Sequence, residues 1–154
     1  MLLRAYRESD AAALCALFFD TVHTVCAKDY TEQQCDAWAP REFDCAALCG
    51  RLARSYALVA ECGGVLAGFA NLGQEGYFDC LYVSARMQRR GVATALADAM
   101  ERRAAQQGAS RMVSDVSITA RPFFEHRGYR VLREQTVIRH GVSMTNYHME
   151  KVLP

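Results

Sequence analysis

A short polar turn in the middle of the chain combines three arginines with a glycine. Arg86, Arg89 and Arg90 precede Gly91, at which a segment with helical periodicity begins. The start of a helix has free backbone N–H groups and partial positive charge, so cations are poorly placed there unless they share an anion. Glycine lets the backbone approach such an anion closely. The turn therefore predicts a phosphate-binding site, and the alternative is that the arginines simply extend into water.

This turn lies between an expected strand and an expected helix. Residues 77–83 contain β-branched and aromatic residues and no strand breaker. Residues 91–107 place apolar side chains at helical spacing, and Gly108 follows as a stop signal. The order strand, turn and helix puts the anion site at the helix start.

The rest of the chain predicts further helices and a set of strands that form hairpins. Helices are expected from residue 10 to about 25, from Thr31 to Trp38, from Asp44 to Arg54 and at residues 119–127. Strands are expected at residues 2–6, 56–61, 65–72, 111–117, 129–139 and 142–152. Because the strand at 111–117 follows a helix, we expect it to run parallel to the strand at 77–83.

Two motifs resemble signatures of the GCN5-related N-acetyltransferase (GNAT) family. Gln88-Arg89-Arg90-Gly91-Val92-Ala93 resembles the family's Gln/Arg-x-x-Gly-x-Gly/Ala signature, and Ser117-x-x-Ala120-x-x-Phe123-Phe124-Glu125-x-x-Gly128-Tyr129 resembles its second signature. The resemblance covers nearly the whole chain and is least distinctive in the first fifty residues. It implies an α/β fold with a mixed sheet of about seven strands and flanking helices, the GNAT-like acyl-CoA N-acyltransferase fold, in a single N-acetyltransferase domain over residues 1–154.

The resemblance also implies an acetyl-CoA cleft and acetyl transfer to an amine. In the resembled family the central strand and the strand after the helix splay apart, and the pantetheine arm pairs with free backbone groups of the central strand. One such N–H would stabilise the oxyanion of the tetrahedral intermediate. The turn and the first helical turn would bind the diphosphate. The implied cofactor-binding residues are Leu81, Tyr82, Val83, Gln88, Arg89, Arg90, Gly91, Val92, Ala93, Thr94, Ser117, Phe123 and Phe124.

The catalytic acid is the point at which the sequence departs from the family pattern. Many relatives have a tyrosine at the second position of the Phe-Tyr pair, and here that residue is Phe124. Tyr82 is the candidate acid, unless its side chain faces away from the cleft. A CoA thiolate can also leave without an acid, because thiols are already fairly acidic.

The candidate base is Asp79, expected on the same strand face as Leu81 and Val83. The alternative is that Asp79 faces solvent or forms a salt bridge. His23, Glu75 and Asp115 are weaker candidates. Cys80 would allow an acetyl-cysteine intermediate, but strand alternation turns it to the opposite face, which favours direct transfer.

The acceptor is expected to be an amine of a small molecule or a peptide. His23, Trp38 and Tyr147 are the candidate substrate residues. The alternatives, which the residue types favour, are a partly exposed helical histidine, a packing tryptophan and an amphipathic strand. One alternative function is a non-catalytic acyl-CoA-binding sensor, which the missing tyrosine favours. A second is a metal-linked interaction module built on the cysteines.

Composition limits the other partners. The chain has 154 residues and a net charge near +1, which predicts no nucleic-acid or membrane partner. The longest apolar run, Ala11–Phe19, is too short to span a bilayer, and the acidic residues before it argue against a signal peptide. We therefore expect a cytoplasmic protein. A homodimer is compatible with the resemblance, although nothing in the sequence locates an interface.

Seven cysteines lie between Cys15 and Cys80 without a Cys-x-x-Cys motif. Cys45 and Cys49 are spaced to share one face of a helix. A zinc site would need two further ligands, for which the sequence shows no obvious spacing. The expectation is therefore buried free thiols in a reducing compartment and no metal.

Overall fold

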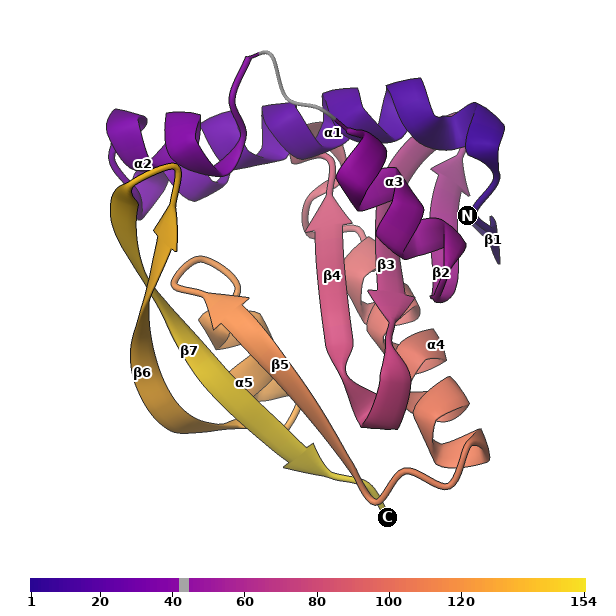
Figure 1. Cartoon of the computed structure of the whole chain (residues 1–154). Coiled ribbons are helices and arrows are strands. Elements are labelled where there is room, and N and C mark those ends of the chain that lie inside the picture. Colours follow the sequence, from indigo (N-terminus) through magenta and orange to yellow (C-terminus); the bar gives the residue numbers. More distant parts are fainter. Residues whose placement is uncertain (42–44) are drawn as a thin grey trace.

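The computed structural model describes residues 1–41 and 45–154 (Figure 1). Its strands and helices match the expected order, and most boundaries agree within two or three residues. The helix expected from Asp44 is present as Ala46–Ala53, and its expected first residue, Asp44, lies outside the described residues. In chain order the elements are β1 Leu2–Ala5, α1 Ala11–Thr24, α2 Glu32–Trp38, α3 Ala46–Ala53, β2 Tyr56–Cys62, β3 Val65–Leu72, β4 Phe78–Val83, α4 Val92–Gln106, β5 Arg111–Ser117, α5 Arg121–His126, β6 Arg130–Arg139 and β7 Val142–Val152.

The strands form two antiparallel sheets that open from each other like a V. One sheet has the order β1-β2-β3-β4 and the other has the order β5-β7-β6. Figure 1 shows β4 and β5 close together at the base of the V and well apart at the opposite end. The described residues thus contain the expected seven strands in a mixed α/β arrangement, and they confirm the expected fold class.

The two sheets meet at the base of the V. Tyr77 and Val113 form an isolated parallel bridge, and the Ser114 hydroxyl donates to the Phe78 carbonyl over 2.7 Å. The expected parallel relation of β4 and β5 is therefore confirmed, but within the described residues it is limited to this one bridge. Beyond the bridge the strands separate, and each exposes a backbone edge.

A β-bulge lies next to this junction on β4. Leu72 of β3 pairs with Phe78 and Asn71 pairs with Cys80, so Asp79 is an extra residue without a partner. The bulge interrupts the alternation of side chains. The sequence alone suggested that Asp79 shares a face of the strand with Leu81 and Val83. Because of the bulge, simple alternation does not relate Asp79 to those two residues.

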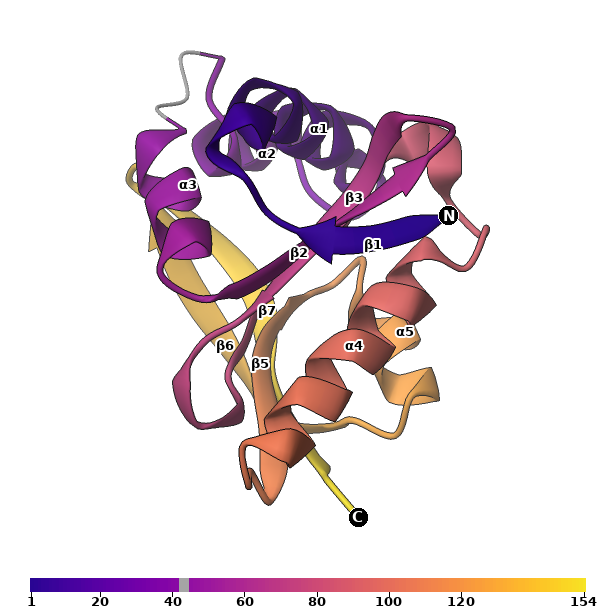
Figure 2. The ribbon, with the colours of Figure 1, turned by 90° about the vertical axis from the view of Figure 1, so that its right-hand side faces the viewer.

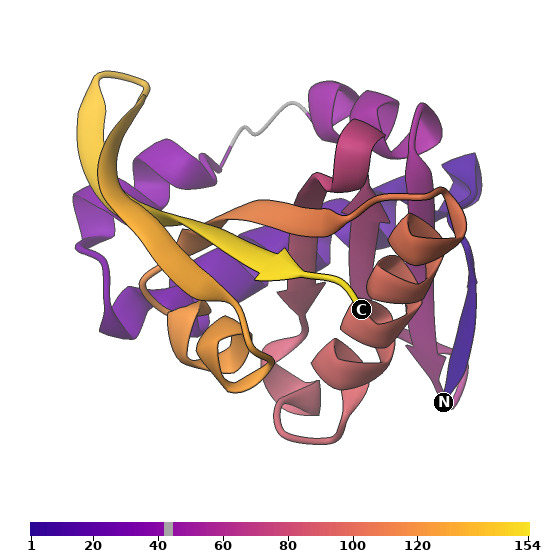
Figure 3. The ribbon, with the colours of Figure 1, turned by 90° about the horizontal axis from the view of Figure 1, so that it is seen from below.

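Helices cover both faces of the four-stranded sheet. Val92, Leu96 and Met100 of α4 pack on one face with the small residues of β3, whereas Leu14 and Phe18 of α1 pack on the other face. Figure 2 shows α1 and α4 on opposite sides of this sheet. Figure 3 shows α4 and α5 on one side of the V, and α2 and α3 on the other.

The N-terminal helical run is mostly apolar. Residues Glu8–Lys28 are long and apolar enough to cross a membrane by length and composition alone. In this fold the run presents Leu14, Leu17, Phe18 and Val22 to the core. A helix of this composition is therefore accounted for by packing against the sheet.

The segment from α1 to α2 closes the wide end of the V. The expected Thr31–Gln34 capping box is present at the start of α2, with both reciprocal hydrogen bonds formed. Tyr30 donates to the Thr145 carbonyl of β7 over 2.7 Å, and it accepts the Ile118 N–H over 2.9 Å. One buried phenol thus joins this segment to both strands of the second sheet that face the gap.

Gly76 lies at the base of the V, where both its positive φ and the lack of space for a Cβ atom require glycine. A methyl group on Gly76, at φ +75°, would overlap the Arg111 carbonyl oxygen, whereas one on Gly141, at φ +77°, would meet no atom of the described residues. We expect Gly76→Ala to lower the free energy of unfolding by about 3 kcal/mol, and Gly141→Ala by only about 1 kcal/mol. Urea unfolding of both variants measures the difference. Equal losses would show that the base of the V tolerates the added methyl group.

Candidate active site

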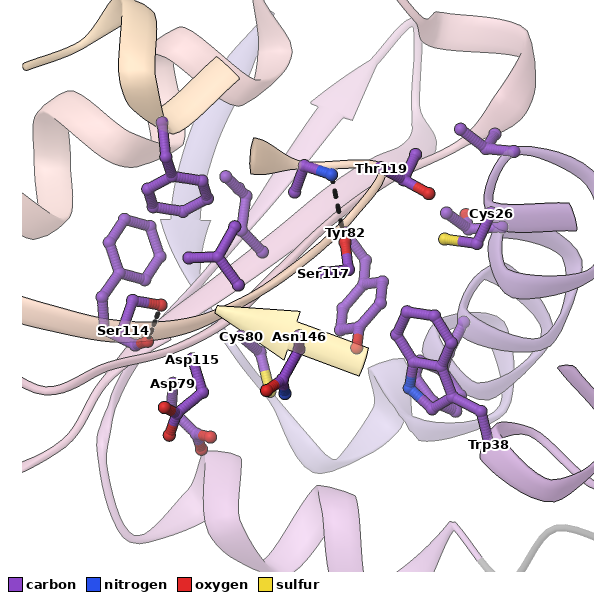
Figure 4. Close-up of a pocket in the computed structure, with 18 of the residues that line it drawn as sticks. Cys26, Trp38, Asp79, Cys80, Tyr82, Ser114, Asp115, Ser117, Thr119 and Asn146 are labelled. Atoms are coloured by element: carbon purple, nitrogen blue, oxygen red, sulfur yellow. Dashed lines mark hydrogen bonds between the residues drawn. The ribbon is translucent and has the colours of Figure 1, made fainter. Parts of the chain in front are cut away.

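A cavity of about 490 Å³ occupies the gap between β4 and β5 (Figure 4). At one end it is lined by Gln88 and by Ala93 in the first turn of α4, together with Phe123 and Phe124 of α5. At the other end it is lined by α1, α2, α3 and the β6–β7 hairpin. A long ligand can therefore enter from the α4 side and meet a second molecule from the α1 side.

The edge of β4 that faces this cavity carries backbone groups without strand partners. The Ser84 N–H donates to a carbonyl of β3 over 2.8 Å, and alternation turns the backbone of Tyr82 toward β3 as well, opposite Phe69. The N–H and C=O groups of Leu81 and Val83 therefore point into the gap. The expectation that Tyr82 offers its backbone to a ligand is wrong, because those groups belong to the β3–β4 ladder.

The open edge ends at Val83. Its carbonyl accepts the Thr21 hydroxyl over 3.1 Å and the Gln88 side-chain amide over 2.9 Å. Gln88 therefore ties the turn after β4 to the end of that strand. This leaves Leu81 as the central residue whose backbone can bind a ligand in the cavity.

The turn before α4 has the geometry of an anion site. Arg89 has φ 60° and Gly91 has φ 81°, and Gly91 is the N-cap of α4. No side chain in the described ranges caps this helix end, so the first N–H groups of α4 are free. A Cβ on Gly91 would extend into open space, where a ligand must approach.

The arginines of this turn have no carboxylate partner in the part of the chain that the structure describes. Among those residues, no Asp or Glu forms a salt bridge with Arg86, Arg89 or Arg90. Arg90 donates to the sulfur of Met87, 3.1 Å away. Cations left unneutralised beside a positive helix end favour an external anion, as the sequence predicted.

The other residues expected to bind the cofactor fall into two groups. The cavity itself is lined by Leu81, Tyr82, Val83, Gln88, Ala93, Ser117, Phe123 and Phe124. The turn and first helical turn beside it contain Arg89, Arg90, Gly91, Val92 and Thr94. This division matches an elongated ligand with an apolar arm inside and an anionic group outside, and the individual contacts remain predictions.

Aromatic rings form the wall of the cavity on the α1 and α2 side. Tyr82 lies edge-on to Phe18 at a centroid distance of 4.9 Å and faces Trp38 at 6.3 Å, and Trp38 contacts Tyr30 at 5.4 Å. Arg139 lies over the Trp38 ring at 5.9 Å. Trp38 therefore lies where the sequence placed a substrate residue.

Two other expected substrate residues lie elsewhere. His23 stacks on Phe19 at 4.2 Å and bonds the Ala39 carbonyl over 2.7 Å, on a helix face that does not line the cavity. Tyr147 packs under Arg121 at 4.4 Å, because alternation along β7 turns it away while its neighbour Asn146 faces the cavity. Neither residue lines the cavity, and a substrate-binding role for them stays a prediction.

The Asp79 carboxylate is paired, which is the alternative that the sequence left open. It accepts Arg51 Nε at 3.2 Å and Nη2 at 3.3 Å, and it accepts Asn71 Nδ2 at 3.0 Å. The bulge also lets the Cys80 sulfur reach the same guanidinium group, at 3.2 Å. Asp79 still lines the cavity, and Arg51 is a site residue that sequence reasoning missed because it comes from α3.

A second carboxylate in the cavity is more tightly held. Asp115 accepts Tyr77, Gln135 and His148, each over 2.8 Å (Asp115 is labelled in Figure 4). Burial alone would raise the pKa of Asp115, but these three hydrogen bonds together lower it below its usual value. The register of β5 and β7 places Asp115 opposite His148, a pairing that the sequence alone did not reveal.

One buried polar atom in the cavity wall has no partner. Asn146 is only 7% exposed, and its Oδ1 makes no hydrogen bond within the part of the chain that the structure describes. Figure 4 shows its amide in the cavity near the middle of the gap. A buried amide oxygen without a donor is unfavourable, so it is suited to a ligand N–H.

Comparison with known proteins identifies the family. A family model described as the acetyltransferase (GNAT) domain matches residues 26–151. The chain belongs to the GNAT family of acetyltransferases. It is 35% identical over 147 residues to the N-acetyltransferase YafP of Escherichia coli, covering 96% of this chain and 93% of that protein.

Solved structures agree with this GNAT assignment. The crystal structure of a GCN5-related N-acetyltransferase from Rhodopseudomonas palustris matches with a TM-score of 0.95 and 38% identity, over 99% of this chain and 95% of the other. The PaiA N-acetyltransferase from Thermoplasma acidophilum, solved in complex with coenzyme A, matches with a TM-score of 0.81 and 16% identity, over 99% and 98% of the two chains.

The side chains of this GNAT protein that hold acidic protons are poor proton donors. Burial raises the pKa of Cys80 to about 12, and desolvation likewise raises the pKa of the Tyr82 phenol far above its ordinary value. Phe124 is 3% exposed and packs edge-on against Phe78 and Tyr129. The position that holds a tyrosine in many relatives is here part of the apolar core.

The network at Asp115 predicts a pH-dependent stability. Because the folded-state pKa of Asp115 is lowered, its contribution is complete above the unfolded-state pKa of about 3.9 and is lost as the pH falls through the folded-state pKa. We expect Asp115→Asn to lower the free energy of unfolding at neutral pH, and we expect the difference in this free energy between wild type and variant to shrink in acid. Urea unfolding from neutral to acidic pH measures the difference. As a control, Asp20→Asn removes an exposed carboxylate of α1. If the difference for Asp20→Asn shrinks by the same amount, the assignment to Asp115 is contradicted.

Proposed function

We propose that this protein transfers the acetyl group of acetyl-CoA directly to the amine of a small molecule or peptide. The observation that carries the proposal is the turn before α4, beside the open edge of β4. Within residues 1–41 and 45–154 this turn has free N–H groups, Gly91 and three arginines without a carboxylate partner. The diphosphate fits the turn, and the pantetheine arm fits the cavity as a partial extra strand along Leu81. We place the reaction in the cytoplasm, where acetyl-CoA is available and free thiols stay reduced.

The Leu81 N–H is the proposed oxyanion donor. It faces the gap next to the bulge, and it is fixed by the β3–β4 ladder on either side of it. A rigid donor of this kind contributes on the order of 3 kcal/mol to lowering the barrier when it meets the developing negative charge. The main chain of β4 thus positions the thioester and polarises its carbonyl in the same step.

The attacking group is the acceptor amine itself. A cysteine relay through Cys80 requires a thiolate, which the raised pKa of this buried sulfur disfavours. We infer that the amine attacks the thioester carbon, a C–N bond forms, and the C–S bond breaks to release CoA thiolate. Because Phe124 has no proton to give, the thiolate leaves without a tyrosine acid and takes its proton from water, as its low intrinsic pKa of about 8.5 allows.

Asp79 is the proposed base for the amine proton. Its hydrogen bonds to Arg51 and Asn71 are 3.0–3.3 Å long, whereas those of Asp115 are all 2.8 Å and lower the pKa of that carboxyl group. Asp79 is therefore the more available of the two carboxylates. Asn146 Oδ1 is the proposed acceptor for an N–H of the incoming amine, and the Trp38 and Tyr82 rings form the wall against which its apolar part packs.

Changing Gly91 tests the phosphate site. We expect Gly91→Glu to lower acetyl-CoA affinity by at least about a hundredfold, because the side chain enters the space of the diphosphate and adds a negative charge. Isothermal titration measures binding, and a thiol-release assay with a panel of amines measures turnover.

The matched control is Gly108→Glu at the other end of α4. Gly108 has φ +83° and open space around its Cβ position, so the backbone strain is the same. Gly108→Glu should bind acetyl-CoA like wild type. Equal acetyl-CoA affinity of the two variants would contradict the phosphate site. If the wild-type protein binds acetyl-CoA but turns over no amine, the result would favour an acyl-CoA sensor instead.

Changing Asp79 tests the base. We expect Asp79→Asn to lower kcat by about a hundredfold with little change in acetyl-CoA affinity, because the amide cannot accept the proton. Asp115→Asn serves as the comparison, with an expected loss of less than about tenfold. Initial rates at saturating acetyl-CoA measure kcat for both variants, and acetyl-CoA titration measures their affinity. Normal turnover of Asp79→Asn would exclude it from this role.

A further inference from the structure

Three of the seven cysteines gather at one place outside the cavity. The sulfur atoms of Cys15, Cys45 and Cys49 all lie within 4.8 Å of one another, and each residue is half-buried. Cys15 comes from α1, Cys45 is the N-cap of α3, and Cys49 lies one turn further along α3. The sequence showed the pair on α3, and the fold adds the third thiol from thirty residues away.

The structure corrects the expectation that all the cysteines are free. Cys15 and Cys45 form a disulfide, with Cα atoms 6.0 Å apart. The other five are free, and of these Cys26, Cys35 and Cys80 are buried as expected. Cys49 thus remains as a free thiol beside a disulfide. Reduction of that bond leaves three thiols already assembled on two helices.

The spacing of the three sulfur atoms suits a soft divalent cation. With metal–sulfur bonds of about 2.3 Å, tetrahedral ligands lie roughly 3.8 Å from one another. The three sulfur atoms lie within 4.8 Å of one another, so the spacing that zinc requires is within reach of these side chains once the disulfide is reduced. Because all three side chains are half-buried, an ion can reach them from solvent, and the fourth position stays open to water.

The cluster lies close to Tyr6 and the start of α1. The Tyr6 side chain is hydrogen-bonded to Cys49, and the nearby Asp10 carboxylate is already paired with Arg4 over 2.7 Å. Three thiolate ligands select a soft divalent cation such as Zn²⁺ over a hard one such as Mg²⁺.

We propose that, with the disulfide reduced, Cys15, Cys45 and Cys49 bind one Zn²⁺ ion as a three-thiolate site. Three S–H bonds lose their protons as three Zn–S bonds form, so that each bound ion releases up to three protons to the buffer. The ion and the disulfide are alternatives, because both use the sulfur atoms of Cys15 and Cys45.

The site joins α1 to α3. On its other face α3 presents Ala47, Leu48 and Arg51 to the cavity, and Arg51 holds Asp79. A bound ion therefore fixes the helix that carries Arg51. This link to catalysis depends on the proposed function, whereas zinc binding itself does not.

The test is zinc binding by the full chain after reduction with a phosphine, measured by competition with a chromophoric chelator under anaerobic conditions. We expect one Zn²⁺ per chain, release of protons on binding, and an ultraviolet thiolate charge-transfer band when Cd²⁺ replaces Zn²⁺. Cys15→Ser and Cys49→Ser should each weaken binding by roughly tenfold or more.

The control variant is Cys62→Ser, which removes another half-buried thiol at the end of β2. It should bind zinc like wild type. Cys49→Ser leaves the disulfide partners intact, so it carries the test even if Cys15→Ser folds poorly. Unchanged affinity in Cys49→Ser, or an equal loss in Cys62→Ser, would overturn the proposal. Because acetyl-CoA titration is a separate measurement, failure here leaves the proposed transfer reaction untouched.

Discussion

The separation of β4 from β5 after a single bridge is the constraint on which the rest of the structure depends. Backbone N–H and C=O groups buried without partners are costly, so an open V inside a small protein has to be stabilised by other groups. At the base this is done by the Ser114 hydroxyl on Phe78, and at the far end by Thr21 and Gln88 on Val83. Only the middle of the strand, at Leu81, is left for a ligand. The fold thus reserves one short stretch of backbone for binding.

At the wide end of the V, the segment from α1 to α2 satisfies backbone groups of the second sheet. Tyr30 satisfies the Thr145 carbonyl and the Ile118 N–H with one phenol, while Gln34 and His140 join α2 to the hairpin tip through the Ser143 and Ala37 carbonyls. These contacts hold the two sheets apart at a fixed distance, because each links α1–α2 to the second sheet. The cavity is therefore a fixed feature of the architecture. Its aromatic wall comes from the same segment that provides these links.

Features that local sequence patterns encode were predicted correctly. Predictions failed for residues whose positions depend on strand register or on packing between distant elements. Helical periodicity, the Thr31–Gln34 capping box and the glycine at Gly91 predicted the elements and the turn before α4, because each pattern lies within a few residues of chain. The bulge at Asp79 arises from its register against Asn71 and Leu72, so simple alternation misplaced this carboxylate relative to its neighbours. His23 and Tyr147 were assigned to the acceptor site without knowledge of which face their elements bury. Arg51 and Cys15 reach their partners only through the packing of α3, which no local pattern shows.

The protonation states in the cavity determine which groups can do the chemistry. Burial keeps the Cys80 thiol and the Tyr82 phenol protonated, and Phe124 contributes no acid. In the proposed reaction the catalytic contribution therefore comes mainly from the backbone donor at Leu81, which transfers no proton, and from a carboxylate that accepts the amine proton, rather than from a side-chain acid. A fixed N–H dipole is already oriented toward the position of the developing oxyanion, so it stabilises the charge without reorganisation at the moment of reaction. A leaving group as acidic as a thiol makes such an arrangement sufficient, whereas a poorer leaving group would require the missing tyrosine. The replacement of that tyrosine by a core phenylalanine is thus compatible with thioester chemistry and with few other acyl donors.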